Sequence, residues 1–346
     1  MSKILVIATS SKTRGGITSV INAHKKSPHW KKYNCIWIET HIDSNKLLSL
    51  CYLFIGYIKF LFHLPTAQIL HIHLSQHISA FRKLLFFIPA YILKKKTIIH
   101  FHAFSTETTI NSSKKWIYKY IFTRANKIIV LSDTWEKAVY TSFGINNIEV
   151  VYNPCNTAKS SITHKKQKHI LYAGTINPRK GYVDMIQAFA KIAENHKEWK
   201  IVFAGNGEIE QGKELAKELG IENQCVFLGW INGEQKDKVF KQASIFCQPS
   251  YAEGFPMAVL DAWTYSLPVI STLVGGINDV AKHKENMLVL TPGDVDKLAE
   301  CMQLLIEDEE LYNKIKDASI TFARETFNIE VINKQIENIY DEVINM

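Results

Sequence analysis

The stretch from Ala243 to Gly276, ASIFCQPSYAEGFPMAVLDAWTYSLPVISTLVGG, shows most clearly how this chain folds. It predicts a strand (SIFCQP), a turn (SYAEG), a helix that Pro256 opens, and a second strand (PVIST) ending at a Gly-Gly turn. A helix amino end carries free amides and the positive end of the helix dipole, so it favours an anion. Glu253 precedes this helix and Asp261 lies within it. Amides for phosphate beside carboxylates for hydroxyls suit a sugar nucleotide, although an ordinary strand–helix–strand unit would have the same pattern.

The composition describes a globular protein of two domains. The chain has 346 residues, of which 47% are hydrophobic and 21% are charged. Its six cysteines are scattered and form no C-x-x-C pair, which argues against a disulfide framework or a cysteine metal site and favours a reducing cytosol. The first residues, MSKILVIATSSK, do not resemble a secretory signal.

The charge is distributed unevenly along the chain. The net charge is +8, but residues 1–158 carry +14 and residues 159–346 carry −6, and no acid occurs from Ser44 to Thr106. Two apolar helices with basic flanks are expected in this region, at Lys46–Phe62 and Ala80–Lys96. Each is shorter than the roughly 20 residues that span a bilayer. Core helices remain an alternative, but the pattern favours an anionic membrane surface over nucleic acid.

The N-terminal half predicts strands separated by helices, at Lys3–Ala8, Asn34–Glu39, Ile69–Leu74, Thr97–Phe101 and Lys127–Leu131. Such alternation predicts a parallel sheet covered on both faces, whose ligands gather at the carboxyl ends of the strands. The first strand leads to Gly15 and Gly16 at a helix start, a weak signal for a phosphate cradle. This loop matches neither G-x-G-x-x-G nor the Walker A pattern, so dinucleotide and P-loop sites lose support.

Four histidines lie near the ends of two strands: His71 and His73 in ILHIHLS, and His100 and His102 in IIHFHAFS. A period of two places both rings of each pair on one face of the sheet. Three interpretations stay open: structural packing, a zinc site formed by the two pairs, and contact of His102 with substrate. Zinc is the weakest, because no carboxylate or cysteine lies nearby in the sequence.

A second strand–helix series follows a polar, basic segment, NTAKSSITHKKQKH, which predicts the linker between two domains. The glycine-bearing turns after its strands contain Gly205, Gly207 and Gly229. These turns would converge on one crevice. Arg179 and Lys180, at a helix start, offer the best clamp for a diphosphate, against the alternative of a solvated charged turn.

Taken in order, these segments resemble a family 4 glycosyltransferase of the GT-B type over nearly the whole chain. The motifs that carry the resemblance are the Gly15-Gly16 loop, HFHAFS, VLSD, VYNP, YAGTINPRKG, FAGNGE, VFLGW and the stretch quoted first. The resemblance implies an α/β fold of two Rossmann-like, doubly wound domains facing across a cleft. Residues 1–155 would bind the acceptor and residues 165–328 the nucleotide sugar. A closing helix at about 329–346 would pack back on the first domain.

The resemblance also implies roles for individual residues. Lys180, helped by Arg179, would neutralise the diphosphate, Glu253 would bind hydroxyls of the donor sugar, and His102 would sit at the reacting sugar. Those three, Glu253, His102 and Lys180, are the expected catalytic residues. The expected donor contacts are Gly15, Gly16, Arg179, Lys180, Gly205, Gly207, Gly229, Glu253, Gly254, Phe255, Pro256, Met257 and Asp261. No metal ligand is expected.

Two positions depart from the family pattern. Asp261 stands where the family's Glu-x7-Glu motif has a second glutamate, so its contact with ribose would be longer or bridged by water. Thr175 follows Gly174 where the family often has an arginine. Arg179 is the expected replacement for that charge.

The implied reaction moves a hexose-type sugar from a UDP- or GDP-linked donor to a saccharide acceptor, with retention and without a cofactor or metal. A polyprenyl-linked acceptor in bacterial surface polysaccharide synthesis (lipopolysaccharide or capsule) fits the membrane-facing composition. The expected location is the inner face of the cytoplasmic membrane, without a nucleic-acid partner. Alternatives are a nucleotide-sugar epimerase of the same architecture and a non-catalytic glycan- or lipid-binding relative.

Overall fold

The computed structural model describes residues 3–155 and 165–346, which form two compact units. Unit 1 comprises Met1–Pro154 and Ile329–Met346, and unit 2 comprises Cys155–Asn328. Most of the predicted linker, residues 156–164, lies outside the described residues. Each unit contains one six-stranded parallel sheet, which confirms the two-domain α/β fold.

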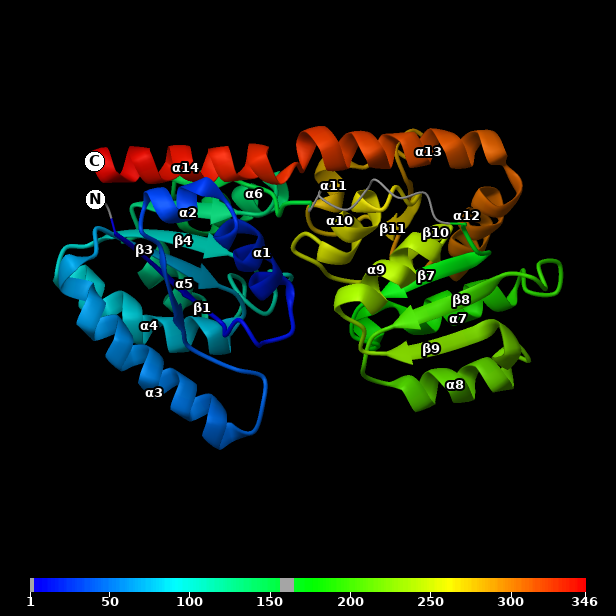
Figure 1. Ribbon diagram of the computed structural model, residues 1–346, viewed down its shortest axis with the longest axis horizontal. Helices are drawn as coiled ribbons and strands as arrows, with labels where there is room; N and C mark the ends of the chain where they lie inside the picture. Colours follow the sequence, from blue (N-terminus) through cyan, green and yellow to red (C-terminus); the bar gives the residue numbers. More distant parts are fainter. Residues whose placement is uncertain (1–2, 156–164) are drawn as a thin grey trace. The chain divides into compact units, whose positions relative to one another are not determined.

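The sheet of unit 1 has the strand order β2-β1-β3-β4-β5-β6, and Figure 1 labels its strands β1, β3 and β4. Its strands are β1 (Ile4–Ala8), β2 (Ile36–Glu39), β3 (Ile69–Leu74), β4 (Lys96–Phe101), β5 (Lys127–Val130) and β6 (Ile148–Val150). The chain first adds β2 on one side of β1 and then returns to add β3 on the other. The loops after β1 and β3 therefore flank the point where the winding direction reverses, at which open α/β sheets bind ligands.

Helices cover both faces of this sheet. They are α1 (Gly16–Lys25), α2 (Pro28–Lys32), α3 (Lys46–His63), α4 (His77–Ile92), α5 (Lys115–Phe122), α6 (Asp133–Phe143) and α14 (Ile329–Asn345). Leu5 and Ile7 of β1 face the core that α3 to α6 close, whereas Ile4 and Val6 face the core that α1 and α14 close. This alternation follows from the two-residue period of a strand.

The last helix packs against unit 1 because its apolar residues form one stripe. Ile332, Ile336, Ile339, Tyr340 and Val343 of α14 recur at helical spacing, and all are almost fully buried. The end of the chain thus completes the core of the first unit.

Two sequence predictions in this unit need correction. The helix expected at Ala80–Lys96 runs from His77 to Ile92, because Lys94 adopts a left-handed conformation (φ 52°) and Lys96 already begins β4. The helix expected at Lys46–Phe62 continues through a short 3-10 turn to Thr66. With 21 residues, and a mean hydropathy of 1.8 over its most apolar 18-residue window, it is long and apolar enough to cross a membrane. The prediction that it is too short was wrong.

The sheet of unit 2 has the order β12-β11-β10-β7-β8-β9. Its strands are β7 (His169–Ala173), β8 (Lys200–Ala204), β9 (Cys225–Gly229), β10 (Ile245–Gln248), β11 (Val269–Thr272) and β12 (Leu288–Leu290). Its helices are α7 (Tyr182–Ala190), α8 (Ile209–Glu218), α9 (Gly233–Gln242), α10 (Met257–Thr264), α11 (Ile277–Val280), α12 (Val295–Glu307) and α13 (Glu309–Thr321). This is the strand order of dinucleotide-binding sheets, and the winding reverses between β7 and β10.

Candidate functional site

The candidate site of unit 2 lies where its sheet reverses direction. β7 and β10 are hydrogen-bonded neighbours. The chain leaves β7 toward the 3-10 turn Pro178–Lys180, and it leaves β10 toward the loop that precedes α10. Both loops follow carboxyl ends of parallel strands, so they meet at one edge of the sheet. Residues 73 positions apart in the sequence are thereby brought into contact.

Glu253 is the centre of this contact. Its carboxylate is largely buried, and Lys180 donates a short hydrogen bond to Oε1. Ser250 Oγ donates to the same oxygen at 2.9 Å and Gln248 Nε2 at 3.2 Å. Arg179 Nη1 lies 3.7 Å from it. One carboxylate therefore stands among two cations and two neutral donors, and the cluster as a whole keeps a net positive charge that suits an anionic ligand.

The turn that carries the two cations is held rigidly against the β10 loop. Arg179 Nη1 donates to the carbonyl of Ala252 at 2.5 Å, and the amide of Tyr251 donates to the Arg179 carbonyl at 2.8 Å. Gly181 follows in a left-handed conformation (φ 72°), and a Cβ there would lie 2.0 Å from the Pro249 carbonyl oxygen. Only glycine allows this close approach, which brings Lys180 to Glu253.

The amino end of α10 stands directly after Glu253. Pro256 is the residue before the helix, not its first residue, and Met257 begins the helix. The first-turn amides of such a helix have no partner within the helix and can bind an anion. Gly254 accepts a hydrogen bond from the amide of Gly276 at 2.7 Å, so the Gly-Gly turn after β11 supports the loop.

Phe255 belongs to the core of unit 2 through its side chain. It is almost fully buried and packs against Trp263 and Phe327, with ring centroids 6.2 and 5.1 Å away. Only its backbone can contact a donor. The ring instead anchors the loop, because a large buried aromatic fixes the backbone that carries it.

Asp261 has a cationic partner of its own. Lys236 of α9 donates to Asp261 Oδ2 at 2.6 Å, and both side chains are about one third exposed. This ion pair links α9 to α10. Asp261 therefore stands in a cationic environment, which a ribose hydroxyl would have to share.

The remaining predicted residues of unit 2 lie in turns after strands. Gly205 and Gly207 follow β8, and Gly229 ends β9. A Cβ on Gly205 would lie 1.7 Å from the carbonyl oxygen of Gly174, so the turns after β7 and β8 touch through their backbones. Thr175 is exposed, and its carbonyl accepts a hydrogen bond from Tyr172 at 2.8 Å.

In unit 1, Gly15 immediately precedes α1 and Gly16 begins it. The loop before them is tied to the end of β2. The amide of Ser10 donates to the His41 carbonyl at 2.7 Å, and the amide of Ser11 donates to the Glu39 carboxylate at 2.6 Å. These contacts shape a helix start at the reversal point of the first sheet.

The four histidines form one stack on the face of the sheet that α14 covers. His71 and His73 lie 4.6 Å apart between ring centroids, His73 and His100 4.9 Å, and His100 and His102 4.2 Å. The hydroxyl of Tyr340 in α14 lies 2.7 Å from Nδ1 of His71. His73 Nδ1 lies 2.9 Å from His102 Nε2.

Burial keeps these imidazoles neutral. Desolvation lowers the pKa of His71, His73 and His100 well below 6.5, and it lowers the pKa of His102 to about 3. Both ring nitrogens of His100, and Nε2 of His71, are buried without a hydrogen-bond partner among the described residues. A second proton on any one ring would create a positive charge that is buried among the other rings, which is unfavourable.

Three of these rings lie close enough together to be considered as metal ligands. Ligand nitrogens of His71, His73 and His100 lie within 4.8 Å of one another. The rings are close to parallel, with interplanar angles of 22°, 7° and 28°. Lone pairs lie in the ring planes, so parallel rings direct them side by side and not toward one ion about 2 Å away. The arrangement fits a packed neutral stack better than a zinc centre.

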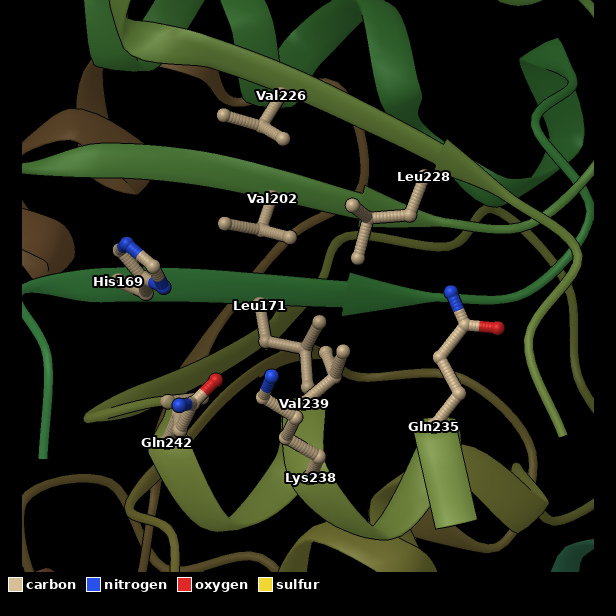
Figure 2. A pocket seen from close by; sticks show the side chains of 10 residues that line it. His169, Leu171, Val202, Val226, Leu228, Gln235, Lys238, Val239 and Gln242 are labelled. Atoms are coloured by element: carbon tan, nitrogen blue, oxygen red, sulfur yellow. The ribbon is translucent and has the colours of Figure 1, made fainter. Parts of the chain in front are cut away.

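A pocket of about 250 Å³ lies elsewhere in unit 2, between its sheet and α9 (Figure 2). Leu171, Val202 and Leu228 line it from three neighbouring strands, and Val239 faces them from α9. Its lining is mainly apolar and includes none of the residues around Glu253. We therefore assign the candidate site to the charged cluster and not to this pocket.

Sequence reasoning missed several contributors to the site, namely Asn177, Lys236, Gln248 and Ser250. Gln248 ends β10 and Ser250 lies two residues after it, where ligand-facing residues are expected, so their position could have identified them. Lys236 carried no signal, because its pairing with Asp261 depends on how α9 packs. Asn177 accepts from the Lys180 amide at 3.1 Å and caps the turn.

Comparison with known proteins gives a consistent result. Residues 156–322 match the family model "Glycosyl transferases group 1". A glycosyltransferase of Haemophilus influenzae without assigned specificity is 29% identical over 241 residues, covering 68% of this chain and 67% of that protein. A lipopolysaccharide 1,6-galactosyltransferase of Salmonella typhimurium is 27% identical over 192 residues, covering 54% of this chain and 53% of that enzyme.

Among solved structures, HepE of Anabaena in complex with UDP and glucose superposes with a TM-score of 0.82. The superposition covers 99% of this chain and all of that chain, at 17% sequence identity. At this identity the likeness concerns the fold alone. The sequence matches support a group 1 glycosyltransferase, and the structural match shows the GT-B fold.

Proposed function

We propose that this group 1 glycosyltransferase of GT-B fold transfers a hexose-type sugar, with retention, from a UDP- or GDP-linked donor to a saccharide acceptor. The acceptor is linked to a polyprenyl carrier, and the product enters a bacterial surface polysaccharide. The protein works at the inner face of the cytoplasmic membrane and needs neither a metal nor a cofactor. The UDP and glucose bound by HepE, and the galactosyltransferase activity in the name of the Salmonella relative, support this proposal.

The observation that carries the proposal is the cluster of Lys180, Arg179 and Glu253 before the amino end of α10. A diphosphate placed there meets two cations and the helix amides. The carboxylate of Glu253 accepts hydrogen bonds from hydroxyls of the attached sugar. Asp261 binds the ribose, and the turns at Gly205, Gly207 and Gly229 line the same edge.

The chemistry requires little beyond positioning and charge. The acceptor hydroxyl oxygen forms a bond to the anomeric carbon while the bond from that carbon to the diphosphate oxygen breaks. The hydroxyl proton passes to the departing diphosphate oxygen on the same face of the sugar. Negative charge grows on the diphosphate, so Lys180 and the helix amides act mainly on the transition state. Gly15 and Gly16 approach the phosphates, and His102 contacts the reacting sugar.

The direct test is Lys180→Ala. Loss of a preorganised charge contact is expected to lower turnover by about 10²-fold or more. Lys168→Ala is the matched control, because Lys168 also pairs with one carboxylate, that of Glu198, but on an exposed surface. Nucleotide release with donor and acceptor present reports turnover. Near-wild-type turnover of Lys180→Ala would remove this residue from the mechanism.

The donor class is measured separately by thermal shift with UDP, GDP and their sugars. Stabilisation by one base over the other identifies the donor. The rival activity, epimerisation of the nucleotide sugar, needs no acceptor. Conversion of the donor to an epimer in an acceptor-free assay would therefore replace glycosyl transfer as the proposed reaction.

A further inference from the structure

Helix α3 of unit 1 presents an apolar face that the described part of the chain does not cover. Leu47, Leu50, Phe54, Ile58 and Phe62 recur at intervals of three or four residues, so they share one face of the helix. The exposed fraction is 65% for Phe54 and 79% for Phe62. Although this helix has the hydropathy of a membrane segment, only 17% of its most apolar window is buried.

The neighbouring helices extend this surface. In unit 1, α3 and α4 run beside each other at one end of the view in Figure 1. Exposed apolar side chains of α4, of Leu93 directly after it and of α5 are Ile78, Phe81, Leu85, Ile88, Ile92, Leu93 and Trp116. The rings of Phe81 and Trp116 contact edge to face, with centroids 5.9 Å apart, which joins α4 to α5. Exposed apolar side chains gathered on neighbouring helices mark an interaction site.

The contacts of α3 with its own sheet keep this face turned outward. Gly56 and Phe60 are the buried residues of the helix. A Cβ on Gly56 would lie 2.1 Å from the carbonyl oxygen of Glu39, so α3 rests on the end of β2 through bare backbone. Lys59 donates to the carbonyl of Trp37 at 3.2 Å on the same side. The outward direction of the apolar face is therefore built into the fold.

The charges around this surface are mostly positive, and the exposed acids at its edge are Asp43, before α3, and Glu107. No acid occurs between Ser44 and Thr106. Lys46, Lys94, Lys114, Lys115, Lys119 and Arg124 are exposed around the three helices. An apolar face with a cationic rim is complementary to an anionic bilayer, in which acyl chains receive the apolar side chains and phosphates receive the cations. Two copies of this face would instead place like charges together.

We propose that the face formed by α3 and α4 is a monotopic docking surface that lies in the plane of an anionic bilayer. The side chains of Phe54, Ile58 and Phe62 enter the boundary between head groups and acyl chains, roughly 5–10 Å deep. α3 stays packed on β2 through Gly56 and does not cross the bilayer. This inference deepens the proposed function, since it assigns the contact that brings a lipid-linked acceptor to the enzyme.

The docking surface adjoins the candidate acceptor side of unit 1. α3 begins shortly after the carboxyl end of β2, and His41 Nδ1 lies 2.6 Å from Ser49 Oγ in the first turn of the helix. The carbonyl of His41 also holds the amide of Ser10 in the loop that leads to Gly15. The head group of a lipid in contact with the start of α3 therefore arrives at the same sheet edge as that loop.

The test is co-sedimentation of the full chain with vesicles of phosphatidylcholine alone and with vesicles that also contain phosphatidylglycerol. We expect binding to the anionic vesicles that falls as salt is added. The double variant Phe54→Glu and Ile58→Glu should weaken this binding by about 10-fold or more, because each side chain loses its transfer into the acyl region. Leu219→Glu, an exposed apolar residue of unit 2, is the control and should bind like wild type.

A tryptophan placed at position 54 (Phe54→Trp) reports depth through the quenching by brominated acyl chains that it adds to that of the wild type, whose seven native tryptophans include the exposed Trp116. Additional quenching on anionic vesicles supports insertion, and its absence overturns it. Unchanged binding of the double variant also overturns the proposal. So does a wild-type dimer in lipid-free solution that the double variant abolishes, because the face would then pair two copies. Retention in the membrane after high salt and alkaline washing would mean that α3 crosses the bilayer.

These outcomes are independent of the proposed reaction. Donor binding by the double variant is measured by the same nucleotide thermal shift, and Lys180→Ala is tested for vesicle binding. Failure of docking with intact donor stabilisation rejects this inference alone. Failure of turnover with intact vesicle binding rejects the proposed function alone.

Discussion

The histidine stack makes the stability of unit 1 sensitive to mild acid. Folding lowers the pKa of His71, His73 and His100 well below 6.5, because burial disfavours the charged ring. In the unfolded chain these rings titrate near 6.5, so below that pH the unfolded chain binds more protons than the native one. Stability is therefore fully present above about pH 6.5 and is lost as the pH falls.

The size of the loss follows from the unfolded-state titration alone. Each ring that stays neutral in the native state lowers the free energy of unfolding by about 1.4 kcal/mol at about pH 5.5, and by almost nothing at about pH 7.5. Three such rings together lower it by about 4 kcal/mol at the lower pH. A domain is stable by only about 5–15 kcal/mol, so this is a large share.

His100→Leu tests the reasoning, because neither ring nitrogen of His100 has a hydrogen-bond partner among the described residues. Replacing an unsatisfied polar ring by an apolar side chain should leave stability near neutral pH unchanged or raised. The acid-induced loss should shrink by about 1.4 kcal/mol. The control is Ile98→Val, on the same strand and the same face of the sheet. It should lower the free energy of unfolding by the same amount at about pH 5.5 as at about pH 7.5.

The assay is urea unfolding read by pulsed hydrogen exchange of peptides from β3 and β4, so that unit 1 is measured separately from unit 2. Wild type should unfold at lower urea at about pH 5.5 than at about pH 7.5. Equal stability at both values would refute the account. An undiminished acid loss in His100→Leu would show that His100 takes no part in it.

Three further results are expected. Gly205→Ala should destabilise unit 2 by about 1–3 kcal/mol, because a Cβ would meet the Gly174 carbonyl; an unchanged melting temperature would contradict that contact. Ser132→Ala should lower the free energy of unfolding in urea by about 1 kcal/mol, because the Ser132 hydroxyl caps α6 by accepting from the Trp135 amide at 3.1 Å. No loss would mean that another group replaces the cap. Asp261→Asn should weaken nucleotide binding about tenfold in calorimetry, because it removes the charge of the proposed ribose ligand. The same variant should change the free energy of unfolding by less than about 1 kcal/mol, because the ion pair of Asp261 with Lys236 is partly exposed. Equal nucleotide affinity would remove Asp261 from the site.

Local patterns predicted the fold well because both sheets are built from buried parallel strands. Short apolar runs predicted the strands of the first sheet and the two strands of the opening stretch, whereas β12 (Leu288–Leu290) was missed because three residues carry almost no periodic signal. The end of α4 was predicted too late because Lys94 adopts a left-handed conformation that the sequence does not indicate, since no glycine or proline stands there. The length of α3 was underestimated because Pro65 falls inside a 3-10 turn that continues the helix.

The candidate site was harder, because its central contact depends on strand order. The sequence indicated Lys180 as a phosphate ligand and Glu253 as a sugar ligand, each from its own loop. It contained no sign that the two side chains pair with each other, since that requires β10 to lie beside β7 in the sheet. In the proposed mechanism, this pairing changes the energetics of donor binding: a diphosphate would have to compete with a buried carboxylate for the Lys180 ammonium. Binding would then release Glu253 Oε1 from its cation as sugar hydroxyls arrive to donate to it, so the two halves of the proposed donor recognition would be coupled through one ion pair.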